Sequence, residues 1–156
     1  MSIARTVRNY LEQHRVRYDV VPHARTHSST QTAAAAHVPG DNLAKSIILK
    51  DETGYVMAIL PSTHRLELGR LHKTLSRPLG LATEEEIAGL FYDCEPGAVP
   101  ALGPAYGVMT LMDDSLAEQP EVYFEAGDHT ELIRVRGDQY AHLMAGVSHG
   151  RFSHHV

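Results

Sequence analysis

The sequence contains one cysteine, no tryptophan and no long apolar run. A single cysteine, Cys94, excludes an intramolecular disulfide and a zinc site built from cysteines. No apolar run approaches the ~20 residues that a membrane-spanning helix needs. Residues 1–5 also lack the apolar core of a signal peptide, so we expect a cytoplasmic protein with no membrane partner.

The chain has little positive charge for its length. A formal net charge of −5 argues against a protein that coats DNA or another long nucleic acid. The charge is unevenly distributed, because residues 113–131 hold seven acids and no Lys or Arg. A basic stretch lies instead at residues 64–77, where the candidate phosphate contacts are Arg65, Arg70, Lys73 and Arg77. This pattern indicates a partner that offers a few phosphates, or else a solvated helix face.

The 156 residues are enough for one domain with a substantial core. Periodicity and capping signals predict helices at 3–14 (capped by Ser2), 28–36, 66–75, 83–90 and 138–144 (capped by Asp138). Strands are predicted at 18–21, 47–50, 55–60, 107–112, 122–125 and 131–136, and residues 51–54 (D-E-T-G) are predicted to join the second and third as a hairpin turn. The interleaved order predicts a single α+β domain, with a mixed, largely antiparallel sheet or distorted barrel surrounded by helices. We assign residues 1–147 to this domain and residues 148–156 to a flexible His-rich tail.

The segment Asp93–Gly103 (D-C-E-P-G-A-V-P-A-L-G) carries the strongest local signal. Its prolines, glycines and alanines are incompatible with a regular helix or central strand, so they predict a loop of fixed shape with an accessible backbone. Lys45 lies where a polar loop meets the apolar run that starts at Ser46. A cation there, facing such a loop, suits a phosphate or a polarised carbonyl, although a surface lysine at a strand edge is the simpler alternative.

Three further candidates for chemistry are His129, Cys94 and the pair of His23 and His27. His129 follows Gly127 in a tight turn that could direct its ring into a cleft as a donor or general base, or leave it solvated. Cys94 would act as a nucleophile only beside a histidine base, and lone cysteines are more often buried apolar residues. His23 and His27 are four apart, but the strand and proline before them disfavour a ligating helix turn, so we expect no metal.

The order of motifs resembles the YbaK-type aminoacyl-tRNA deacylases, which include editing domains associated with prolyl-tRNA synthetase. The matching motifs are the Ala-rich helix, K-S-I-I-L at 45–49, L-P-S-T-H-R-L-E-L at 60–68, A-T-E-E-E-I at 82–87, the loop at 97–103 and V-Y-F-E-A-G at 122–127. The family loop commonly reads G-G-I-S-P-L-G, whereas this chain has Ala98, Pro100 and Ala101 at three of those positions. This difference indicates a divergent subgroup.

The resemblance implies hydrolysis of the ester that joins a wrong amino acid to the terminal adenosine of tRNA, without a metal, another cofactor or a protein nucleophile. Lys45 is expected to hold the substrate near its terminal phosphate and carbonyl. The residues implied for the oxyanion hole and proton transfer are Gly97, Ala98, Val99, Ala101 and His129. Those implied for substrate binding are Ser29, Thr30, Asp93, Pro100, Gly103 and Gly127; helix capping is the simpler role for Ser29 and Thr30.

The expected partner is the acceptor end of a mischarged tRNA, with an aminoacyl-tRNA synthetase as a further candidate. The alternative is a non-catalytic module of the same fold that binds tRNA ends, amino-acid derivatives or a protein.

Overall fold

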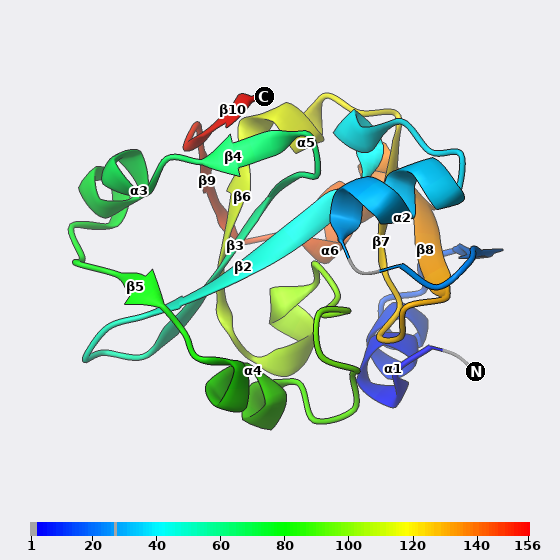
Figure 1. Ribbon diagram of the computed structural model, residues 1–156, viewed down its shortest axis with the longest axis horizontal. Coiled ribbons are helices and arrows are strands. Elements are labelled where there is room, and N and C mark those ends of the chain that lie inside the picture. The colour runs from blue at the N-terminus through cyan, green and yellow to red at the C-terminus, as the bar shows by residue number, and fades with distance from the viewer. Residues whose placement is uncertain (1–2, 27) are drawn as a thin grey trace.

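The computed structural model describes residues 3–26 and 28–156 (Figure 1). The helices are α1 (Arg5–Gln13), α2 (Ser29–Ala35), α3 (Leu68–Leu75), α4 (Glu84–Leu90), α5 (Asp114–Ala117) and α6 (Gly137–Leu143). The strands are β1 (Asp19–Pro22), β2 (Ala44–Lys50), β3 (Tyr55–Pro61), β4 (His64–Leu66), β5 (Gly80–Leu81), β6 (Met109–Asp113), β7 (Glu121–Glu125), β8 (Glu131–Arg136), β9 (Ser148–Gly150) and β10 (Ser153–His155). Two short 3-10 helices, Gly40–Asn42 and Gly103–Tyr106, complete the elements.

A long hairpin of β2 and β3 forms the centre of the fold (Figure 1). Its turn is closed by Asp51, whose Oδ1 accepts from the backbone N–H groups of Thr53 and Gly54 at 2.8 and 3.2 Å. This confirms the predicted hairpin, because an aspartate at the first turn position can satisfy the backbone locally. The hairpin places Lys45 opposite Leu60 at the end of β2 that is far from the turn.

One of the sheets is mixed, as predicted. The larger has the order β5-β2-β3-β6-β9, and β6 runs parallel to both β3 and β9. A second, antiparallel sheet has the order β1-β8-β7. A bridge between Leu43 and Tyr123 connects the start of β2 to β7, so the two sheets curve around a shared core. The result is the predicted single α+β domain.

The helices begin where local chemistry favours them. Thr83 and Glu86 form a reciprocal capping box at the start of α4, as the T-E-E-E sequence predicts. The Ser28 side chain caps α2 by accepting from the Gln31 N–H. The predicted cap of the first helix, Ser2, lies outside the described residues; α1 starts at Arg5, with Ala4 at the N-cap position. α6 forms where the last helix was predicted, but the predicted cap was wrong, because the N-cap is Arg136 and Asp138 lies in the first turn.

The prediction of a flexible tail at residues 148–156 was also wrong. β9 pairs with β6 and β10 pairs with β4. Between them, Phe152 is fully buried, and its N–H donates to Asp113 Oδ2 at 3.0 Å. Because the segment has few apolar residues, the sequence predicted no regular structure there. One buried phenylalanine and the backbone pairing are nevertheless enough to fix residues 148–156 on the domain.

Candidate functional site

A cavity of about 360 Å³ lies where the start of β2 meets α2, α4, the 93–103 loop and the β7–β8 turn. Its lining residues are Ser28, Ser29, Thr32, Leu43, Ala44, Lys45, Ser46, Ile47, Ile48, Leu81, Ala82, Glu84, Ile87, Gly97, Val99, Glu125 and His129. Residues far apart in sequence, Lys45, Gly97 and His129, therefore line the same cavity. A volume of this size suits a small ligand.

Lys45 is half-buried at this cavity. Its Nζ donates to the carbonyl oxygens of His64, at 2.6 Å, and Ser62, at 3.4 Å. Burial lowers the pKa of Lys45, and the positive charge of Arg65 lowers it further. The ammonium is thus oriented by two backbone acceptors, and at least one of its three N–H bonds is left for a ligand.

The 93–103 loop presents part of its backbone to the cavity. Gly97 has a φ of +84°, a left-handed conformation that favours glycine. The Ala98 N–H is already used, because it donates to the Glu95 carbonyl at 3.0 Å. Pro100 has no N–H, so among the cavity-lining residues Gly97 and Val99 are the loop positions whose N–H groups could bind an oxyanion. Ala98 and Ala101 are fully buried, so they pack inside the domain and support the loop.

His129 is attached to the same loop. Its Nε2 lies 2.6 Å from the Pro96 carbonyl oxygen, and because a carbonyl only accepts, Nε2 is the protonated nitrogen in that bond. The His129 backbone N–H donates to Glu95 Oε2 at 3.3 Å. Gly97 packs so closely that a Cβ added there would lie 3.2 Å from His129 Cε1. With Nε2 as the donor, Nδ1 is the ring nitrogen that can act as an acceptor.

α2 lines the cavity with Ser29 and Thr32, whereas the expected pair was Ser29 and Thr30. Ser29 lines the cavity, as the resemblance implies, whereas Thr30 is exposed and is not among the lining residues. Thr32 takes its place: it is buried, and its Oγ1 donates to the Ser28 carbonyl at 2.9 Å. The helix begins at Ser29, so Thr32 faces inward one turn later.

Four of the implied substrate-binding residues, Asp93, Pro100, Gly103 and Gly127, are not in the lining of the cavity. Asp93 accepts from the Thr6 N–H at 2.9 Å and from the Tyr106 hydroxyl at 2.8 Å, so it ties the loop to α1. Gly103 and Gly127 are buried positions where an added Cβ would collide with Thr110 and Ala4 respectively. Their roles in this structure are close packing and loop support.

Cys94 is placed as an apolar residue. Burial raises the pKa of its thiol to about 12. Its Sγ contacts the Tyr106 hydroxyl at 3.2 Å and Asp93 Oδ1 at 3.5 Å, and within residues 3–26 and 28–156 its polar neighbours include no histidine base. The thiol therefore has neither the pKa nor the partner of a nucleophile.

Sequence reasoning missed Glu125 at the inner end of β7. Burial raises the pKa of its carboxyl to about 8, with a hydrogen bond between Glu125 and Thr32 opposing the shift and the Asp128 charge adding to it. Its Oε2 is buried without a hydrogen-bond partner among the described residues. A neutral carboxyl at neutral pH suits these surroundings. The Y-F-E alternation of the strand was the available signal, since it placed Glu125 on the same face as Tyr123.

The basic stretch divides into two kinds of residue. Arg65 and Lys73 are exposed, and Arg65 is close enough to Lys45 to affect its pKa. Arg70 pairs with Glu67 at 3.0 Å, and Arg77 is held by Asp51 at 2.6 Å with only 18% of its side chain exposed. Arg77 therefore stabilises the β2–β3 turn and is poorly placed for the phosphate contact that was predicted.

Two further features bear on ligands and location. Across residues 3–26 and 28–156, no group of three or more His, Cys, Asp or Glu side chains is arranged to hold a metal ion. His23 belongs to this part of the chain, whereas His27 lies outside the described residues. Within the same ranges, none of the helices has the length and apolar character to cross a bilayer.

Comparison with solved structures finds the same fold. A candidate trans-editing enzyme for prolyl tRNA synthetase superposes with a TM-score of 0.81 at 25% identity, covering 97% of this chain and 96% of that one. A hypothetical protein gives a TM-score of 0.83 at 19% identity, covering 96% of this chain and 100% of that one. A candidate signal transduction protein from Marinobacter aquaeolei gives 0.76 at 21% identity, covering 95% of this chain but 30% of that one.

Sequence comparison agrees with the fold. No curated protein matches the chain significantly. The aminoacyl-tRNA editing domain profile matches residues 23–143, which include Lys45, the 93–103 loop and His129. This match covers well over half of the sequence, and the chain belongs to the aminoacyl-tRNA editing domain family.

Proposed function

We propose that this protein is a trans-acting aminoacyl-tRNA deacylase that removes a mischarged small amino acid from tRNA in the cytoplasm, without a metal or other cofactor. The observation that supports this best is the convergence of Lys45, the Gly97 and Val99 backbone and His129 on one cavity of about 360 Å³. That space suits a small aminoacyl group with part of its ribose. The partner is the acceptor end of tRNA, with a synthetase as a second candidate.

The proposed reaction needs orientation more than activation, because an ester is easier to hydrolyse than an amide. Water adds to the ester carbonyl carbon, the bond from that carbon to the ribose oxygen breaks, and the amino acid leaves. The N–H groups of Gly97 and Val99 would stabilise the negative charge that develops on the carbonyl oxygen. The Lys45 ammonium would hold the terminal phosphate or the same oxygen. His129 Nδ1 would accept a proton from the water and then give it to the departing ribose oxygen, which becomes a hydroxyl.

Glu125 extends this proposal to the amino acid itself. It is a half-buried acidic side chain in the lining of the cavity, and an aminoacyl ester carries an α-ammonium group. Binding of that cation would favour the carboxylate and lower the pKa of Glu125. The Thr32 hydroxyl next to it limits the space for a larger side chain.

A deacylation panel tests the proposed function. The protein would be incubated with tRNAs charged with Ala, Ser, Cys, Thr or Pro, beside the Lys45→Ala variant, and the released amino acid counted. We expect rapid release from one of these tRNAs and a large loss in the variant. Equal rates for folded wild-type and variant protein would contradict the assignment of Lys45.

The second candidate is a non-catalytic binding module. Two observations favour it: both carbonyl contacts of Lys45 are internal, and the loop carries Ala98, Pro100 and Ala101 where the resembled family has Gly, Ser and Pro. Salt-dependent binding of tRNA without release of any amino acid would support this module. Absence of both binding and release would remove both candidates.

A further inference from the structure

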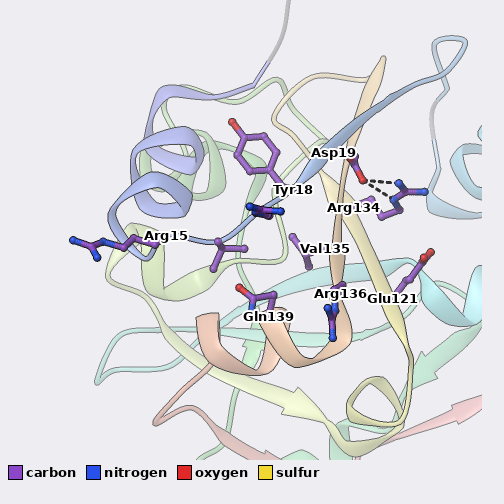
Figure 2. A pocket seen from close by; sticks show the side chains of 10 residues that line it. Arg15, Tyr18, Asp19, Glu121, Arg134, Val135, Arg136 and Gln139 are labelled. Carbon is purple, nitrogen blue, oxygen red and sulfur yellow. Dashed lines mark hydrogen bonds and ion pairs between the residues drawn. The ribbon is translucent and has the colours of Figure 1, made fainter.

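A second cavity, of about 750 Å³, lies apart from the candidate site, where the turn after α1 meets the end of β8 and α6 (Figure 2). We call it the arginine cleft. Its lining residues are Arg15, Val16, Arg17, Tyr18, Asp19, Glu121, Arg134, Val135, Arg136 and Gln139. None of these residues lines the cavity that contains Lys45.

The arginine cleft contains cations that the chain does not neutralise. Arg134 pairs with Asp19, and Arg136 pairs with Asp138 at 3.2 Å. The guanidinium groups of Arg15 and Arg17, by contrast, have no ion pair or hydrogen bond among the described residues. Glu121 is the other acid that faces the cleft, so positive charge prevails there. In a chain of net charge −5, such a concentration favours an anionic ligand.

The backbone at Arg15 adds a second observation. Arg15 ends α1 with a φ of +53°, and its N–H donates to the Glu12 carbonyl at 3.1 Å. Glycine is the usual residue at this position after a helix, because a residue with a Cβ is strained in the left-handed conformation. An arginine in this conformation, at the edge of a basic cleft, points to a use for its charge. In Figure 2 the Arg15 side chain extends outward from one edge of the cleft, away from the other labelled residues, and the Arg134–Asp19 pair lies at the opposite side.

The remaining lining suits a nucleotide rather than a simple ion. Buried Val16 and Val135 form an apolar floor, and half-buried Tyr18 presents an aromatic ring. Gln139, on α6, contributes an amide that can both donate and accept. Arginines, an aromatic ring and an amide together are typical of sites for single-stranded RNA, where bases stack and phosphates are paired.

The spacing of the two cavities limits the ligand further. His129 lines the Lys45 cavity at one end of β8, and Arg136 lines the arginine cleft at the other. At ~3.3 Å per strand residue these two residues are roughly 20 Å apart. One terminal nucleotide cannot occupy both places. A ligand that reaches both must be a chain with repeated phosphates.

We propose that the arginine cleft binds phosphodiester groups of the tRNA, several nucleotides away from the acceptor end that occupies the Lys45 cavity. The proposal rests on the proposed function for the identity of the RNA. Binding at the cleft contributes affinity and register for the tRNA, and it takes no part in bond cleavage.

The test measures binding of uncharged tRNA at several salt concentrations to the wild type, to Arg15→Ala combined with Arg17→Ala, and to Arg151→Ala. Arg151 is an exposed arginine near the chain's C-terminal strands and serves as the matched control. Both cleft residues are exposed, and an unchanged unfolding temperature verifies the fold. We expect weaker binding by the double variant and a salt slope smaller by about 0.7 for each lost phosphate contact. The control should match the wild type.

An unchanged affinity and salt slope in the double variant would overturn the proposal. So would binding of AMP that depends on Arg17 without any matching effect on tRNA, since that outcome assigns the cleft to a free nucleotide. Where the wild type is an active deacylase, the double variant should lower kcat/KM on charged tRNA and leave hydrolysis of aminoacyl-adenosine unchanged. Binding of tRNA does not depend on catalysis. If the wild type releases no amino acid but the double variant still loses affinity for tRNA, the deacylase proposal is contradicted and the proposal for the arginine cleft stands.

Discussion

The Lys45 ammonium donates to the carbonyl oxygen of His64 at 2.6 Å. His64 is in turn fixed from the far end of the chain, because its Nδ1 lies 2.8 Å from Ser153 Oγ. The Ser153 hydroxyl donates to the buried Asp113 carboxylate, also at 2.8 Å. The position of Lys45 therefore depends on the contact between β4 and β10 as well as on its own strand.

Replacement of Lys45 tests the centre of this arrangement. Lys45→Ala should lower the deacylation rate about 100-fold or more, because a preoriented cation is lost from the site of developing charge. Lys50→Ala is the control: it removes a lysine from the same strand that pairs with Glu86 at 2.8 Å outside the cavity. Release of amino acid from charged tRNA is the measurement, and equal losses in both variants would point to a folding defect.

Ser153→Ala should weaken both stability and activity. The change leaves the buried Asp113 oxygen short of a donor, which costs about 1–3 kcal/mol in the free energy of unfolding. Urea denaturation measures the loss in the free energy of unfolding, and kcat on charged tRNA measures the effect of the altered position of Lys45. Ser148→Ala, on an exposed residue of β9, should change neither quantity. If Ser153→Ala changes neither quantity, the series of hydrogen bonds from Asp113 through Ser153 and His64 does not position Lys45.

Gly97→Ala tests the shape of the loop. The left-handed φ and the short approach to His129 together predict a destabilisation of about 1–2 kcal/mol and roughly tenfold slower deacylation. Gly89→Ala, in α4, has no heavy atom within 4 Å of the added Cβ and should increase stability slightly. Thermal unfolding and kinetics on both variants decide the matter, and full activity of Gly97→Ala would show that the loop tolerates other conformations.

Glu125→Gln tests the carboxyl in the cavity through pH. The pKa of Glu125 rises from 4.5 in the unfolded chain to about 8 in the folded protein, so the folded state binds more protons between these values. Wild-type stability should therefore fall relative to the variant as pH rises from about 4.5 to 8, and the difference should then level off. At about 1.4 kcal/mol per pH unit the upper bound is about 5 kcal/mol, which partial solvation reduces. Parallel stability curves for the two proteins would contradict a buried neutral Glu125.

Cys94→Ala should leave deacylation unchanged, because the thiol is a packing residue. With its pKa raised to about 12, Cys94 is protonated at pH 8 and should react with iodoacetamide at least 100-fold more slowly than a free thiol. The same protein in urea should react at the ordinary rate. Rapid alkylation of the folded protein, accompanied by loss of activity, would restore the nucleophile hypothesis.

Local chemistry accounts for what the sequence predicted well. The Thr83 capping box and the Asp51 turn are specified by side chains within three residues of the backbone groups they satisfy, so a linear reading finds them. The Gly97 loop was recognisable because its composition excludes regular structure. Its partners were not, since the closeness of Lys45 and His129 arises from the assembled fold.

The misses have the same origin. Thr30 was expected to bind substrate, but Thr32 lines the cavity instead, because the exact start of α2 decides which threonine faces inward. Glu125 was overlooked because only its burial at the junction of two sheets gives it an unusual pKa. The segment at 148–156 contains almost nothing apolar, and Phe152 acquires its importance from a pocket built by distant strands.

The pairing of β10 with β4 also affects when the site can form during synthesis. The residues that fix the acceptors of Lys45 are made roughly 110 residues after Lys45 itself, a delay on the order of 5–20 s at ~5–20 residues per second. The central hairpin is complete long before then. A nascent chain can therefore have a well-formed sheet and still lack an oriented lysine, so that competence for substrate follows folding of the core as a separate, later event.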